Sequence, residues 1–134
     1  MLKTIPIEIE VKSLEEVGRE MDEIVAKLKK GEDVKKTNKI VVPSLDVARK
    51  ILSPERLRLL AVIEEKHPKS TYQLAALVQR DRRNVVKDLD YLASIGLVKL
   101  SKEKRARKMT IPTIDFNKIN ICIDLRRLLA PSIN

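Results

Sequence analysis

The chain has 134 residues, of which 28 are Lys or Arg and 19 are Asp or Glu, so its formal net charge is +9. This length suits one domain, and an apolar content of 43% is enough for a core, which excludes disorder throughout. The sequence has no apolar run of the ~18 residues that span a membrane and no signal-peptide pattern at its start, so we expect a cytoplasmic protein.

The N-terminal part predicts strands and helices in alternation. Residues 5–11 alternate apolar and polar side chains with the period of a half-buried strand. A helix is expected over residues 14–28, with Ser13 as its N-cap, because apolar residues recur there every three or four positions. Residues 39–42 predict a short strand, and a short helix follows over residues 44–52.

The middle of the chain predicts three helices followed by a β-hairpin. The helices cover residues 54–66, 72–78 and 81–94, because their apolar residues have helical spacing. Ser53 is the expected N-cap of the first helix, and Ser70 or Thr71 is that of the second. Two strands, at residues 97–100 and 108–111, flank a charged turn. This order is that of a winged helix-turn-helix, so the predicted fold class is α+β, with a three-helix core and a hairpin wing.

The C-terminal part predicts one more strand, because residues 119–125 alternate again, and then a short turn of helix. The expected organisation is an N-terminal extension over 1–50, a DNA-binding domain over 51–112 and a C-terminal extension over 113–134. The two terminal strands need partners, which are either each other or a second subunit. We predict a homodimer held by elements outside the DNA-binding domain; the alternative is that these strands extend the sheet of a monomer.

The positive charge is concentrated in the middle of the chain. Residues 53–112 carry 14 basic and 7 acidic side chains, which is a net charge of +7, whereas the segments on either side each have a net charge of +1. A charge confined to one segment forms a directed field and favours a polyanionic partner. Aromatic residues make up only 2% of the chain, so binding of single strands or RNA by base stacking is disfavoured.

The third of these helices carries the candidate DNA contacts. Val85, Leu89 and Leu92 form a stripe that must face the core. Away from that stripe lie side chains that can contact phosphates and base edges, namely Arg82, Arg83, Asn84, Lys87 and Tyr91. The alternative is an ordinary solvated helix face.

The hairpin turn supplies a second candidate surface. Its basic side chains are Lys102, Lys104, Arg105, Arg107 and Lys108. Such a tip suits a phosphate backbone or the minor groove of duplex DNA. A hairpin tip that is charged for solubility is the alternative.

The stretch from Leu52 to Ile111 resembles the MarR-like winged helix-turn-helix domains of small prokaryotic transcriptional regulators. The resemblance rests on the motifs LSPERLRLL (52–60), STYQLA (70–75), RDRRNV (80–85) and GLV (96–98). It implies a regulator that binds double-stranded DNA, and it adds Ser70, Thr71 and Arg80 to the candidate contacts. Some similar proteins are antitoxins. A second hypothesis is therefore an antitoxin that binds a toxin through its N-terminal extension and autoregulates its operon.

The sequence offers no catalytic or cofactor site. A Ser/His/Asp set, a phosphate loop and metal-ligand spacing are all missing from it, so we expect neither an enzyme nor a bound cofactor or metal. The single cysteine, Cys122, is expected to be a small buried residue, and His67 to be a capping or surface residue. Asp88 and Asp90 point about 200° apart on a helix, so Asp88 is expected to orient a basic neighbour instead of sharing a substrate.

Overall fold

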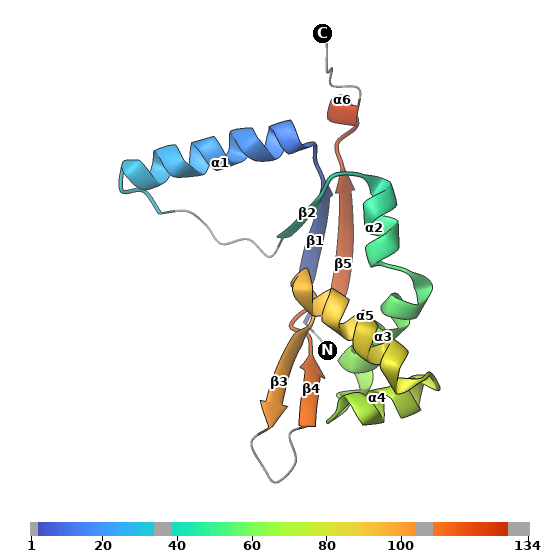
Figure 1. The fold of residues 1–134 in the computed structure, drawn as a ribbon. Helices are drawn as coiled ribbons and strands as arrows, with labels where there is room; N and C mark the ends of the chain where they lie inside the picture. The colour runs from blue at the N-terminus through green and yellow to red at the C-terminus, as the bar shows by residue number, and fades with distance from the viewer. Residues whose placement is uncertain (1–2, 34–38, 104–108, 129–134) are drawn as a thin grey trace. The chain divides into compact units, whose positions relative to one another are not determined.

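The computed structural model describes residues 3–33, 39–103 and 109–128, and Figure 1 shows how its elements are arranged. The elements in chain order are β1 (Pro6–Val11), α1 (Leu14–Lys29), β2 (Lys39–Val42), α2 (Leu45–Ile51), α3 (Pro54–Lys66), α4 (Thr71–Val78), α5 (Arg82–Ser94), β3 (Lys99–Glu103), β4 (Met109–Thr113), β5 (Lys118–Ile123) and α6 (Leu125–Leu128). One sheet has the strand order β2-β1-β5, and β3 and β4 form a second sheet. The fold class is α+β.

The chain forms two compact units. The first consists of Met1–Ile5 and Arg49–Lys118, and the second consists of Pro6–Ala48 and Ile119–Asn134. Each unit is therefore built from segments that lie far apart in the sequence. The chain passes from one unit to the other after Ile5, after Ala48 and after Lys118.

The first unit packs three helices and a hairpin around one apolar core. Helix α4 contacts α3, α5 and strand β4. The strands β3 and β4 pair antiparallel, with Lys99 opposite Thr113 and Glu103 opposite Met109. The core is made of aliphatic side chains that are fully or almost fully buried: Leu59, Ile63, Leu74, Val78, Val85, Leu89, Leu92 and Leu97. These residues fall on the helix faces that the apolar spacing predicts.

Each helix of this unit follows a capping residue: Ser53 is the predicted cap of α3 and Ser70 is one of the two candidates for α4, whereas Asp81, expected as the first residue of α5, is its cap. Ser53 accepts a hydrogen bond from the backbone N–H of Arg56, and Pro54 occupies the first helical position of α3. Ser70 caps α4, and Asp81 caps α5 by accepting from the N–H of Arg83. Because these caps satisfy backbone donors that the helices cannot pair, they set where each helix starts.

The turn between α4 and α5 contains no glycine. Gln79 takes the left-handed conformation there, with φ 56° and ψ 47°, and the N–H of Arg80 bonds to the carbonyl of Ala75 at 3.1 Å. This is the closure that usually employs glycine at a helix C-terminus. His67 ends α3 in the same conformation and is exposed, which confirms its prediction as a capping residue.

The second unit is built on the sheet β2-β1-β5. Strand β1 pairs parallel with β2, with Glu8 opposite Lys39 and Val11 opposite Val42. The terminal strands β1 and β5 are hydrogen-bonded neighbours within one chain. They therefore satisfy each other, which was one of the two partners that the sequence left open. Ile7 and Ile9 supply the buried face of β1.

The cysteine prediction was wrong, because Cys122 is exposed in β5 and forms no disulfide. Strand alternation predicts which residues share a face, but it does not predict which face is covered. On β5 the neighbouring apolar side chains are also open to solvent, since Ile121 is 47% and Ile123 37% exposed.

A cluster of ion pairs joins three elements of the second unit. The Lys12 ammonium lies 2.7 Å from Glu10 and also contacts Glu20 on α1, while Lys39 on β2 lies 3.2 Å from Glu10. Partial burial disfavours the charged form of Glu10, but hydrogen bonds from Lys12 and Lys39 outweigh it, so the pKa of Glu10 lies below its ordinary value.

Candidate nucleic-acid interface

Helix α5 has the two faces that its sequence predicts. Val85, Leu89 and Leu92 are at most 1% exposed and lie in the core of the first unit. Four of the candidate DNA contacts are exposed on the remainder of the helix surface, namely Arg82, Arg83, Asn84 and Lys87. The helix is thus held by its apolar stripe and presents three cations and one amide to solvent.

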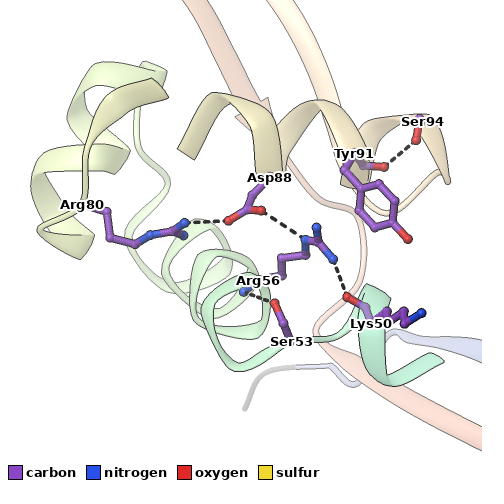
Figure 2. A network of polar contacts seen from close by, with 7 residues as sticks. All are labelled: Lys50, Ser53, Arg56, Arg80, Asp88, Tyr91 and Ser94. Carbon is purple, nitrogen blue, oxygen red and sulfur yellow. Dashed lines mark hydrogen bonds and ion pairs between the residues drawn. The ribbon is translucent and has the colours of Figure 1, made fainter. Parts of the chain in front are cut away.

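A network of polar contacts attaches α5 to the rest of the first unit, as Figure 2 shows. One oxygen of Asp88 lies 3.2 Å from Nε of Arg56 on α3, and the other lies 2.8 Å from Nη2 of Arg80 in the turn before α5. The Asp88 side chain is only 17% exposed, and those of Arg56 and Arg80 are 22% and 25% exposed. The prediction that Asp88 orients a basic neighbour is confirmed, and it orients two.

Arg56 makes three further contacts that lock the start of α3 against α5. Its guanidinium lies 4.1 Å from the ring centroid of Tyr91 and donates to the backbone carbonyl of Lys50. Its own N–H is held by the Ser53 cap at 3.3 Å. Figure 2 shows Tyr91, Arg56 and Asp88 gathered on one side of α5.

Two of the candidate contacts, Arg80 and Tyr91, are therefore engaged within the chain. Arg80 donates to Asp88, and its Nη1 atom is buried with no hydrogen-bond partner among the described residues. The Tyr91 ring is half-buried against Arg56. Helical spacing marked Tyr91 as a candidate contact and the resemblance marked Arg80. Neither held information on Arg56 of α3, which lies 32 residues before Asp88.

The start of α4 is the second part of the candidate interface. Ser70 caps the helix by accepting from the N–H of Gln73 at 3.0 Å. Thr71 is buried, and its hydroxyl donates to the Thr110 carbonyl of β4 at 3.4 Å, so it ties α4 to the hairpin. Tyr72, which was not among the predicted contacts, is 72% exposed at this helix start. Its place in the STYQLA motif, directly after Ser70 and Thr71, is the signal that could have pointed to it.

A groove of about 580 Å³ lies between α4, α5 and the hairpin. Its wall includes the first residues of α4, the Arg82 and Asp90 side chains of α5, and Met109 and Thr110 of β4. The groove therefore adjoins the start of α4, part of the basic side of α5 and the start of strand β4, next to Lys102 of β3.

Of the five basic residues predicted for the hairpin turn, Lys102 lies among the described residues. Lys102 lies on β3 and is exposed. The other candidate residues of the turn, Lys104, Arg105, Arg107 and Lys108, lie outside the described residues. Within the described strands, Lys102 lies opposite Thr110.

Within 3–33, 39–103 and 109–128, no group of three or more His, Cys, Asp or Glu side chains could hold a metal ion. In that part of the chain, no helix combines the length and apolar character needed to cross a bilayer.

The family described as HVO_A0114 matches residues 51–121, which extend from the end of α2 through the three helices and the hairpin into β5. No curated protein and no solved structure matches the chain.

Proposed function

The chain belongs to the HVO_A0114 family, and we propose that the segment it shares with that family contains a winged helix-turn-helix that binds duplex DNA. In this proposal, α5 is the recognition helix and the β3-β4 hairpin is the wing. The protein is a transcriptional regulator of the cytoplasm, in keeping with its resemblance to MarR-like regulators.

The observation that supports this most is the surface of α5. Arg82, Arg83 and Lys87 are exposed on a helix whose opposite side is fully buried, and a groove separates that helix from a hairpin. A helix of about 10–12 Å diameter fits the major groove of B-DNA, which is about 12 Å wide. The hairpin beside it then meets the flanking backbone or minor groove.

The candidate residues divide into two roles. Arg82, Arg83, Asn84 and Lys87 are exposed and contact DNA, with Arg83 and Asn84 able to bond bidentately to guanine and adenine. Lys102 and the basic turn beyond it contact phosphates. Arg80, Tyr91 and Thr71 act through other residues of the chain, because their side chains are engaged with Asp88, Arg56 and Thr110. They position the recognition helix and the wing.

A regulator of this kind binds a palindromic operator as a homodimer, with two recognition helices about 34–36 Å apart. The first unit binds DNA, and dimerisation falls to the second unit. The second unit lies wholly in the two segments outside residues 53–112, each of which has a net charge of only +1.

The test is selection of bound fragments from a genomic duplex library, followed by fluorescence anisotropy on the selected duplex and on a scrambled duplex of equal length. We expect tighter binding to the selected duplex by about a thousandfold or more, which is the lower end of the range for specific binders. Equal affinity for both duplexes, or no enrichment over input, would reject the proposed function.

A further inference from the structure

Helix α1 carries an apolar face that the described residues leave uncovered. Leu14 is 81% exposed, Met21 55%, Val25 46% and Leu28 59%. The same helix buries Glu16 and is attached to the second unit through the contact of Glu20 with Lys12. These two residues give α1 polar contacts with its own unit, while Leu14, Met21, Val25 and Leu28 are exposed and Val17 and Ile24 are half-buried. Much of the apolar face is therefore open to solvent, which is unusual for an amphipathic helix.

The apolar residues of α1 follow the spacing of a two-helix seam. Leu14, Val17, Met21, Ile24 and Leu28 are separated by steps of three, four, three and four residues. This places them at alternating a and d positions of a heptad repeat, the pattern by which one helix packs against another. Leu14, Met21 and Leu28 occupy a positions, and Val17 and Ile24 occupy d positions.

An antiparallel pair of α1 helices brings a positions of one copy against d positions of the other. With Met21 opposite the partner's Ile24, twofold symmetry places Val17 opposite the partner's Leu28. Four apolar layers then close around a symmetry axis that passes between residues 22 and 23. The uncovered face of α1 is complementary to itself in this register.

The residues that flank this seam agree with the antiparallel register. On one side Glu20 lies opposite the partner's Lys27, so the symmetric interface contains two opposite-charge pairs. Glu20 is 40% exposed and keeps its contact with Lys12, while Lys27 is exposed. In a parallel pair Glu20 would instead face the partner's Val25, so the charge of Glu20 would not be matched.

On the other side of the seam, Gly18 lies opposite the partner's Val25. A glycine inside a helix costs about 1 kcal/mol relative to alanine. A Cβ added at Gly18 would meet no atom within 4 Å, so packing within the chain does not require this glycine. Opposite a second α1, it leaves room for the valine and lets the two helices approach.

We propose that α1 pairs with the α1 of a second copy of this chain as a short antiparallel coiled coil. The inference rests on the homodimer of the proposed function and identifies its contact. A helix of 16 residues is about 24 Å long, so the interface is small and the dimer should dissociate on dilution. We identify the partner of α1 as a second copy of the chain because one twofold axis matches the apolar layers, the Glu20–Lys27 charge pairs and Gly18 with the partner's Val25.

The first test measures the mass of the full-length protein by sedimentation equilibrium over a concentration series without DNA. We expect a mass approaching twice 15.3 kDa at high concentration. Met21→Glu places a charge in the central layer and should weaken dimerisation by at least about tenfold. Ala26→Glu introduces the same side chain on the opposite, exposed side of α1 and should leave the dimer unchanged. Circular dichroism establishes that both variants fold.

The second test determines the orientation of the two helices. In a Cys122→Ser background, Val17→Cys and Leu28→Cys proteins are oxidised separately and as a mixture. The antiparallel register predicts a covalent dimer in the mixture alone, because like positions lie about 16 Å apart along the axis. Disulfides formed by each protein alone would contradict it, since a parallel pair brings like positions together.

The remaining outcomes separate this inference from the proposed function. A wild-type mass of one chain at all concentrations, or a Met21→Glu protein as dimeric as the wild type, would overturn the helix pairing. If such a protein still binds its selected duplex, the proposed function stands without it. A toxin that covers α1 of a monomeric chain is the outcome that the antitoxin hypothesis predicts, and it would also overturn the pairing.

Discussion

Arg80 and Asp88 are joined by an ion pair of 2.8 Å that fixes the turn before α5 to the second turn of that helix. The second oxygen of Asp88 extends the contact to Arg56 on α3. One carboxylate therefore connects helix α3, the turn between α4 and α5, and helix α5 itself. Asp88 thus helps to hold the candidate recognition helix in place.

Asp88→Asn should destabilise the first unit by about 1–3 kcal/mol. The change leaves the partly buried guanidinium groups of Arg56 and Arg80 without their counter-charge, and loss of one member of such a group is costly. Urea unfolding measures the effect. Asp90→Asn, on the exposed part of the same helix, is the matched control and should change stability by less than about 0.5 kcal/mol. Equal effects of the two changes would show that the network does not stabilise the fold.

Gln79→Gly should stabilise the protein by about 1 kcal/mol. Gln79 holds a left-handed conformation that costs an L-residue about 1–2 kcal/mol and costs glycine little. Thermal unfolding tests it, with Gly96→Ala as the opposite change. Gly96 has φ +89° and open space around an added Cβ, so its substitution should destabilise through the backbone alone. A loss of stability in Gln79→Gly would mean that the glutamine side chain makes a contact that outweighs this strain.

Acid should weaken the second unit through Glu10. Because its folded-state pKa is lowered from 4.5, its contribution to stability is present above pH 4.5 and is lost as the pH falls through the folded-state value. Urea unfolding of the wild type and Glu10→Gln should therefore differ most near neutral pH and converge at low pH. A difference between them that does not change over this range would contradict the coupling of Glu10 to Lys12 and Lys39.

Much of the first unit could be predicted from its sequence. The stripe of Val85, Leu89 and Leu92 is a local pattern with the period of a helix, and Ser53 and Ser70 are local caps, so neighbouring residues were sufficient to predict them. The same holds for the strand at residues 39–42. These predictions succeeded because each depends on residues within one or two turns.

The failures concern contacts between distant segments. No spacing rule connects Tyr91 to Arg56, which lies 35 residues earlier, so the tyrosine was assigned to the exposed face of α5. The burial predicted for Cys122 failed because period-two alternation says nothing about which side of β5 is covered. The same limit left the partner of β1 undecided until the strand order showed it to be β5.

The wing should supply affinity without sequence preference. Lys102→Ala removes an exposed cation of β3 that meets phosphate in the proposed complex, so it should weaken selected and scrambled duplexes by similar factors. It should also lower the slope of log affinity against log salt by about one. Anisotropy titrations at several salt concentrations measure both quantities. A loss confined to the selected duplex would move Lys102 from backbone contact to base recognition.

The central claim is that the exposed face of α5 recognises base sequence, and the affinity of Arg83→Ala for the selected and scrambled duplexes tests it most directly. Arg19→Ala, which removes an exposed arginine from α1, is the control of equal charge. We predict that Arg83→Ala loses about 1–3 kcal/mol on the selected duplex, a factor of about five to 150, and much less on the scrambled one. Arg19→Ala should bind both as the wild type does. Equal losses on both duplexes, or no loss on either, would contradict the assignment of α5 as the recognition helix.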